Sequence, residues 1–149
     1  MNLDQLKQEL AEDEGCKYEI YLDHLGLPTV GIGHLITEDD PEARMNVGTP
    51  VSEERVNMLF RRDIAVTVDD CHRLYDDFKD LPEEAQLIIA NMMFNLGYPR
   101  LSKFVGMKSC VDKRDFNGAA EEMIDSKWFD QVPNRAKRLV ARMRSIEDA

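Results

Sequence analysis

The amino-acid sequence predicts an α+β fold that is mainly helical and has a small antiparallel sheet near its N-terminus. Polar and apolar residues alternate over 18–22, as in a strand, and a strand pattern interrupted by glycines returns over 27–35. From residue 52 onward the apolar residues recur with the period of an α-helix. With 149 residues, 43% of them hydrophobic, the chain is long enough to bury a core, and we expect one domain, 1–149.

The N-terminal part of the chain is expected to form one helix and a hairpin. Leucines at helical spacing predict an amphipathic helix from residue 3 to about 13, and Gly15 is a natural end for it. The sequence DHLG at 23–26 is typical of a turn, so the strands on either side should pair. Glu14 then lies where the helix ends, and Thr29 lies on the returning strand.

The remaining sequence predicts a loop and then only helices. Residues 37–50 are loop-like, and a long helical pattern follows over 52–75. A strongly apolar helix over 83–95 should stop at Gly97. Shorter helices are expected over 100–112, 115–125 and 133–145, the last with proline at its first position.

The charge of the chain argues against nucleic acid as a partner. The formal net charge is −10, and an acidic surface repels phosphates. Only 127–144 departs from this trend, with six Lys and Arg residues against Asp130. That segment could meet an anionic polymer, or its cations could simply favour the C-terminal end of a helix. The sequence leaves both readings open.

Several classes of protein are made improbable by what the sequence lacks. The cysteines are far apart in the sequence, at Cys16, Cys71 and Cys110, so a zinc or redox motif is not expected. We expect all three to be reduced thiols. No run of about 18 apolar residues exists, which argues against insertion into a membrane. The first ten residues do not have the pattern of a signal peptide.

The segment with the most chemical information runs from Glu14 to His34. Asp23 follows Glu14 by nine residues, and Thr29 follows Asp23 by six. Two carboxylates in different environments are what glycoside hydrolysis requires, since one must donate a proton while the other stays ionised.

This segment resembles the active-site signature of the T-even type phage lysozymes, glycoside hydrolase family 24. The signature is Glu, eight residues, Asp, five residues, Thr, followed closely by Gly-Ile-Gly-His, which stands here at 31–34. Further matches are LFRRD at 59–63, NMMFNLG at 91–97 and SKWFDQVPNRAKR at 126–138. Their order and separations agree with the family, so the resemblance covers nearly the whole chain.

The resemblance implies a two-lobed lysozyme fold. A sheet lobe of about 14–50 would be joined by the long helix, about 52–75, to a helical lobe of about 81–149 that includes the N-terminal helix. In the family the saccharide lies in the cleft between the lobes.

The resemblance also implies the reaction. The family cuts the β-1,4 bond between N-acetylmuramic acid and N-acetylglucosamine in peptidoglycan, with inversion. Glu14 would be the general acid, Asp23 the base that orients water, and Thr29 a second holder of that water. No cofactor or metal is implied, because two carboxylates and a water suffice.

Further residues match family positions around this site. Substrate-binding positions correspond to Leu35, Phe94 and Asn95, although Phe94 could equally pack in a core. His34 would pair with Asp63 on the long helix, which would keep His34 protonated. Arg135 matches an arginine that reaches the catalytic glutamate. Trp128 and Phe104 match aromatic residues of the family's core.

The chain also departs from the family. A serine and an asparagine of the saccharide cleft are replaced by Met107 and Glu122, which puts the saccharide contacts there in doubt. The loop after the sheet and the C-terminal tail are shorter than in well-known members. Those members are basic, whereas this chain is acidic.

Together these features lead us to expect a phage or prophage endolysin. It would act as a monomer on peptidoglycan, wait in the host cytoplasm until a holin-type protein gives access to the periplasm and cell wall, and cause cytolysis. Two alternatives remain: a wall-binding module without activity, and a lytic transglycosylase. The presence of Glu14, Asp23 and Thr29 together argues against both, because neither needs all three.

Overall fold

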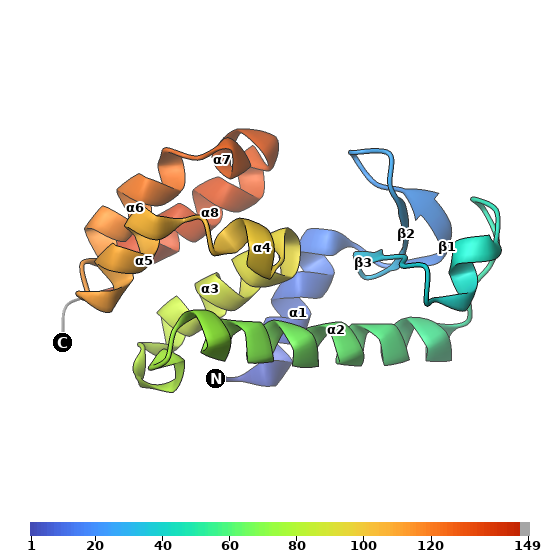
Figure 1. Ribbon diagram of the computed structural model, residues 1–149, viewed down its shortest axis with the longest axis horizontal. Coiled ribbons are helices and arrows are strands. Elements are labelled where there is room, and N and C mark those ends of the chain that lie inside the picture. The colour runs from blue at the N-terminus through green and yellow to red at the C-terminus, as the bar shows by residue number, and fades with distance from the viewer. Residues whose placement is uncertain (147–149) are drawn as a thin grey trace. The chain divides into compact units, whose positions relative to one another are not determined.

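The computed structural model describes residues 1–146 and confirms the α+β class: one small antiparallel sheet stands among helices (Figure 1). The chain divides into two compact units, which we call the sheet unit, Leu3–Val66, and the helical unit, Met1–Asn2 with the chain from Thr67 onward. The N-terminal helix belongs to the sheet unit in this division, whereas the family resemblance implied a place in the helical lobe. Residues 147–149 of the predicted lobe lie outside the described residues.

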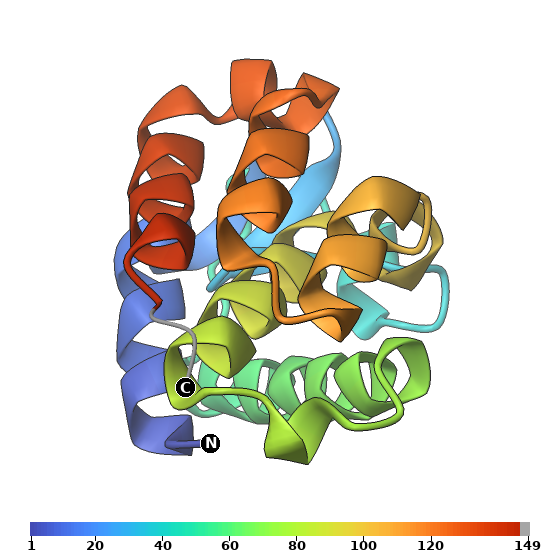
Figure 2. The same cartoon turned by 90° about the vertical axis from the view of Figure 1, so that its left-hand side faces the viewer.

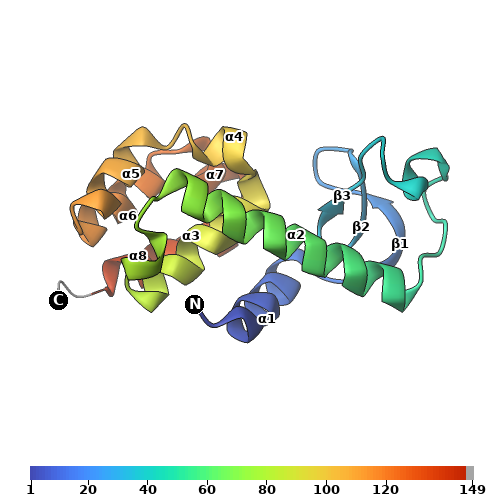
Figure 3. The same cartoon turned by 60° about the horizontal axis from the view of Figure 1, so that its bottom comes forward.

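The sheet unit contains one helix before the strands and the first part of a long helix after them. Its elements are α1 (Leu3–Glu14), β1 (Lys17–Leu22), β2 (Pro28–Gly31), β3 (His34–Leu35), the 3-10 helix η1 (Pro41–Arg44) and the beginning of α2 (Glu53–Leu74). The strands are antiparallel in the order β1-β2-β3 (Figure 3). As predicted, α1 buries Leu6 and Leu10 on one face and ends before Gly15, whose φ is +74°, but Leu3 of the same predicted face is exposed at the start of the helix.

The returning strand is interrupted, which the sequence analysis did not predict. Its pattern indicated one strand over 27–35, but β2 stops at Gly31 and β3 begins at His34. Gly31, the last residue of β2, and Gly33 have φ values of +67° and +64°, so the backbone leaves the extended conformation between these two residues. A Cβ at Gly31 would stand 2.8 Å from Cγ1 of Val56 on α2. The turn therefore packs closely against the long helix.

The predicted loop 37–50 is more ordered than its sequence indicated. It contains η1, and its last residues run beside β1. Val51 donates a backbone hydrogen bond to Tyr18, and Ile20 donates one to Thr49. The loop thereby pairs with the outer edge of β1, which would otherwise carry unpaired backbone groups.

The helical unit takes up the rest of α2 and a series of shorter helices. These are η2 (Phe78–Asp80), α3 (Glu83–Leu96), α4 (Tyr98–Leu101), α5 (Val105–Asp112), α6 (Phe116–Ile124), α7 (Lys127–Gln131) and α8 (Pro133–Arg144). The apolar helix α3 is buried along most of its length, as its sequence predicts. Figure 2 shows α6 lying between α5 and α8. No helix within residues 1–146 is both long enough and apolar enough to cross a membrane.

The helices of this unit differ from the sequence prediction at two places. The helix expected over 100–112 is divided, because Phe104 has a non-helical backbone with ψ of 63°. The short helix α7 was missed, since its five residues are too few for a periodic pattern. Its signal was present at Ser126, whose hydroxyl accepts a hydrogen bond from the Phe129 amide as an N-cap.

Candidate active site

Glu14 is the last residue of α1, and its half-buried side chain lies against the turn between β2 and β3. A Cβ built at Gly33 would overlap the Glu14 carboxylate, beginning with Oε2. Gly33 also has a positive φ that other residues rarely adopt. The Glu14 carboxylate therefore rests on Gly33, and only glycine at this position leaves room for it.

Asp23 begins the turn between β1 and β2, and the backbone of the turn holds its side chain. Its Oδ1 accepts hydrogen bonds from the amides of Leu25, at 2.8 Å, and Leu27, at 2.9 Å. Oδ2 accepts no hydrogen bond within the described residues. One carboxylate oxygen is thus fixed by the turn, and the other is left for water or substrate.

Thr29 follows on β2, and its side chain is buried. Its hydroxyl donates a hydrogen bond of 2.9 Å to the carbonyl oxygen of Leu27. Leu27 therefore connects the two predicted water-holding residues, since its amide binds Asp23 and its carbonyl binds Thr29. Because the hydroxyl proton is used in this way, the oxygen of Thr29 keeps its lone pairs for accepting a hydrogen bond.

Leu35 lies directly opposite Thr29 in the pairing of β2 with β3. Its side chain is 49% exposed at the edge of the sheet. An exposed leucine on the strand next to Thr29 is accessible to a ligand, and its role in binding substrate stays a prediction.

His34 makes the expected pair with Asp63 and a second one that the sequence analysis missed. Its Nδ1 lies 2.7 Å from Asp63 Oδ2, and its Nε2 lies 2.7 Å from Asp40 Oδ2. An ionised carboxylate only accepts hydrogen bonds, so the two bonds form together when both ring nitrogens carry protons, and they favour the charged ring. Burial alone would lower the pKa of His34, but the bonds to Asp63 and Asp40 raise it above its ordinary value.

Asp40 is the centre of a small polar network. Beside His34 it accepts from the Thr37 amide at 2.9 Å, and Arg55 lies 3.6 Å from its other oxygen while also binding Glu42. Burial acts to raise the pKa of Asp40, but the bonds from Thr37 and His34 lower it overall. The signal in the sequence is an acid before Pro41, at the N-cap position of η1, within the predicted loop 37–50.

The other predicted site residues lie in the helical unit. Arg135 is buried on α8, and its Nε donates a 2.8 Å hydrogen bond to Asn91 Oδ1 on α3. Asn95 accepts from the indole of Trp128 at 2.8 Å, and that aromatic residue is buried as expected. Phe94 is half-buried on α3. The roles of Phe94 and Asn95 in binding substrate, and that of Arg135 toward Glu14, stay predictions.

The sheet unit thus contains the three residues of the predicted reaction, Glu14, Asp23 and Thr29. Glu14 rests on one turn, and Asp23 with Thr29 is fixed by another. Within residues 1–146 no group of three or more His, Cys, Asp or Glu side chains is arranged so that it could hold a metal ion.

Comparison with known proteins gives a consistent result. The profile of the phage lysozyme family matches residues 11–145. A protein named Probable T4-type lysozyme 2, from Dictyostelium discoideum, is 31% identical to this chain. The alignment is 155 positions long and covers 91% of each chain. The Pre-baseplate central spike protein Gp5 of Enterobacteria phage T4 is 28% identical across 90% of this chain and 26% of its own length. Peptidoglycan hydrolase gp36 of Pseudomonas phage phiKMV is 29% identical across 92% of this chain and 15% of its own.

Proposed function

Because this chain belongs to the phage lysozyme family, we propose that it hydrolyses the β-1,4 bond between N-acetylmuramic acid and N-acetylglucosamine in bacterial peptidoglycan, as a lysozyme (EC 3.2.1.17). Relatives named as lysozymes and as a peptidoglycan hydrolase support this substrate. The observation that carries the proposal is the pair of carboxylates in the sheet unit, held by two separate turns.

The proposed reaction is a single displacement with inversion. Glu14 donates its proton to the glycosidic oxygen as the bond from that oxygen to the anomeric carbon breaks. A water held by Oδ2 of Asp23 and the hydroxyl of Thr29 attacks the anomeric carbon from the opposite face and gives its proton to Asp23. The water needs space between the carboxylates, which an inverting enzyme provides.

Analysis of the products tests this proposal. Purified peptidoglycan is digested, and the new ends are followed by NMR from the first minutes. We expect reducing N-acetylmuramic acid ends that first appear as the α-anomer, because inversion changes the β-linkage. Anhydro ends would indicate a transglycosylase, and β-anomers would indicate retention. Binding of the wall without any new ends would indicate a binding module.

We further propose that the enzyme is an endolysin that acts as a monomer. It would remain in the host cytoplasm until a holin-type protein opens the membrane and gives access to the wall. Membership of the phage lysozyme family supports this role. Expression in the bacterial cytoplasm with and without a co-expressed holin tests it. Lysis should require both proteins, and lysis by the enzyme alone would contradict the dependence on a holin.

A further inference from the structure

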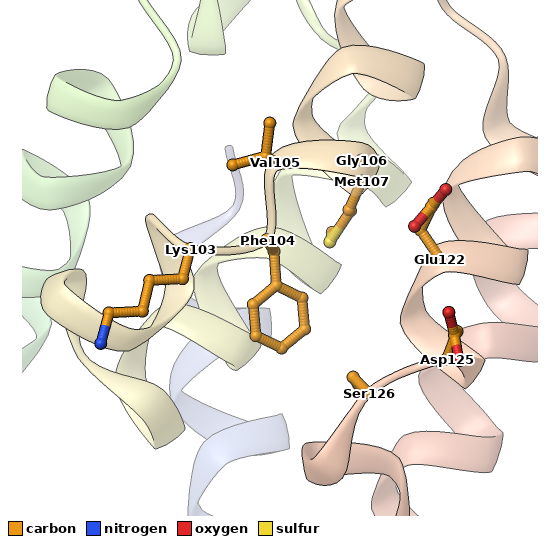
Figure 4. A pocket seen from close by; sticks show the side chains of 8 residues that line it. All are labelled: Lys103, Phe104, Val105, Gly106, Met107, Glu122, Asp125 and Ser126. Carbon is orange, nitrogen blue, oxygen red and sulfur yellow. The ribbon is translucent and has the colours of Figure 1, made fainter.

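The pocket of the helical unit falls at positions of the cleft that the family resemblance implies. It has a volume of about 220 Å³ and lies where the start of α5 faces the C-terminal end of α6 (Figure 4). Met107 and Glu122 line it, and both occupy positions of the family's saccharide cleft. The resemblance therefore places this pocket in the cleft and not at a separate site.

Tyr21 of β1 stands beside the proposed water-holding residues of the sheet unit. It lies opposite Thr29 in the pairing of β1 with β2, and opposed residues carry their side chains on one face, with Cβ atoms about 4.5–5.5 Å apart. The pairing continues into the turn, because the amide of Asp23 donates a 2.9 Å hydrogen bond to the carbonyl oxygen of Leu27. Since side chains alternate along the chain there, Tyr21, Asp23 and Thr29 share one face of the sheet.

The hydroxyl of Tyr21 is a donor that the fold does not use. Ile20, its neighbour in the chain, is buried on the opposite face, whereas Tyr21 itself is only half-buried. Within residues 1–146 its hydroxyl forms no hydrogen bond, and it is not sealed from solvent. A partly buried tyrosine hydroxyl usually has a partner. The hydroxyl is therefore available to a water or a ligand at this face.

Both carboxylates of the proposed reaction act on this phenol. Burial raises the pKa of Tyr21, the negative charges of Glu14 and Asp23 raise it further, and the thiol of Cys16 adds a smaller effect. Such effects weaken with distance, so the hydroxyl lies close to both acids. The phenol consequently keeps its proton near neutral pH and can donate a hydrogen bond.

A cation holds the ring of Tyr21. The ammonium group of Lys17 lies 4.4 Å from the ring centroid, as in a cation–π interaction. In a regular strand the two residues would stand about 13 Å apart. Their partners on β2, Gly31 and Thr29, are only two residues apart, about 7 Å, because β1 is irregular between the two pairs. This irregularity allows Lys17 to reach the ring.

We propose that the Tyr21 hydroxyl is a third holder of the attacking water and that Lys17 positions the ring for it. The proposal rests on the proposed function, which supplies the water. The water would donate hydrogen bonds to Asp23 and Thr29 and accept one from Tyr21 on one lone pair. Its other lone pair forms the bond to the anomeric carbon, and its proton passes to Asp23. The bond to the glycosidic oxygen breaks as Glu14 protonates that oxygen, and Tyr21 keeps its own proton.

Removal of the hydroxyl alone tests the proposal. Tyr21→Phe keeps the ring and its contact with Lys17, so the melting temperature should change little. We expect kcat on soluble peptidoglycan to fall about tenfold, as for the loss of one hydrogen bond in the transition state, with KM unchanged. Tyr98→Phe is the matched control. The Cζ atom of Arg73 lies 3.8 Å from the Tyr98 ring centroid, and within residues 1–146 the Tyr98 hydroxyl forms no hydrogen bond, so this variant should keep the wild-type kcat.

Lys17→Met tests the positioning of the ring. Its kcat should fall about threefold, because the ring is held less firmly. Added to Tyr21→Phe, it should cause no further loss, since Lys17 acts through the hydroxyl. Lys113→Met changes the net charge equally at an exposed site and should keep the wild-type kcat. A full threefold loss in the double variant would contradict the positioning role.

The charge of the phenol gives a readout that a purely structural role would not change. Tyr21 is replaced by a fluorinated tyrosine that ionises near neutral pH, with Lys17, Glu14, Asp23 and Cys16 around it unaltered. The rate should be near that of the wild type while the phenol is neutral and should fall about tenfold as it ionises, because a phenolate cannot donate. The same replacement of Tyr98 should leave the pH profile unchanged.

The outcomes separate this inference from the proposed function. The inference alone is overturned if the wild type cleaves peptidoglycan and Tyr21→Phe cleaves it at the same kcat, or if the fluorinated enzyme keeps the wild-type pH profile. A wild type that cleaves no peptidoglycan would overturn the proposed function and this inference together.

Discussion

The carboxylate of Glu14 rests directly on Gly33, so the proposed acid is positioned by a residue without a side chain. Gly31 and Gly33 are needed for two different reasons. A Cβ at Gly31 would crowd Val56 on α2, whereas one at Gly33 would displace the Glu14 carboxylate. The Gly-Ile-Gly segment is therefore part of the active site, although none of its side chains takes part in the proposed chemistry.

Replacing Gly33 with alanine should lower both the unfolding free energy and the rate of wall cleavage. Its φ of +64° costs a residue with a Cβ about 1–2 kcal/mol in unfolding free energy, and the methyl group would push Glu14 away. We expect a fall in kcat of at least about tenfold, since small misplacements of a reacting group are costly. Urea unfolding and rates of wall cleavage measure the two effects.

Gly48→Ala is the matched control for this variant. Gly48 has φ of +92° and lies in the same unit, but a Cβ there would meet nothing within 4 Å. It should lose stability and keep its rate at temperatures where it is folded. If both variants lose activity equally, backbone strain is the cause and Gly33 does not position Glu14.

Asp23→Asn should distinguish the roles of the two oxygens of the Asp23 carboxylate. The amide oxygen of asparagine can still accept from Leu25 and Leu27, so the turn should persist. The proposed base is removed, and we expect kcat to fall about 10²- to 10⁴-fold with little change in the melting temperature. Wall cleavage and thermal unfolding provide the measurements. Retained activity would assign Asp23 to the turn alone.

The bonds of His34 should make stability depend on pH in a defined window. The pKa of His34 is raised above 6.5, so its stabilising contribution is complete below pH 6.5 and is lost as the pH rises through the raised value. The pKa of Asp40 is lowered from 3.8, so its contribution is present above that pH and is lost as the pH falls through the lowered value. The contribution of the pair should therefore be largest between pH 3.8 and 6.5.

Asp63→Asn tests this coupling. Losing one charged partner should lower the pKa of His34 and reduce the unfolding free energy near pH 5 by roughly 1 kcal/mol. NMR titration of the ring and urea unfolding from pH 3 to 9 supply the data. An unchanged titration would mean that the pair does not hold the proton of His34.

The acidic surface should make activity depend on salt. The net charge is −10 and bacterial wall is also anionic, so their repulsion should weaken as salt shortens its range to about 10 Å at 0.1 M. Turbidity of permeabilised cells should fall faster as ionic strength rises, whereas cleavage of a short uncharged saccharide should not change. Lysis that slows steadily from the lowest salt upward would contradict this.

The sequence predicted the helices with clear apolar patterns and the residues of the active-site signature. The positions of α1 and α2 were predicted because burial on one face leaves a periodic apolar pattern, and that of α3 because its sequence is apolar almost throughout. The pair of His34 with Asp63 was predicted only through the resemblance, since 29 residues separate the partners.

What could not be predicted depends on contacts between segments distant in the sequence. Nothing near Gly33 in the sequence indicates that the Glu14 carboxylate rests on it. Asp40 is an ordinary acid within a predicted loop, and only the folded structure places it beside His34. The pocket beside Met107 and Glu122 also needed α5 and α6 in place. The sequence showed that those two positions depart from the family, but it could not show that they share one cavity.

The most direct test of the central claim compares Glu14→Gln with Glu12→Gln in cleavage of peptidoglycan. Glutamine keeps the shape of Glu14 but cannot donate the proton, whereas Glu12 is exposed on the same helix and has no part in the reaction. We predict a loss of about 10²- to 10⁴-fold or more for Glu14→Gln, with circular dichroism unchanged, and wild-type activity for Glu12→Gln. Equal activity of the two variants would contradict the assignment of Glu14 as the acid.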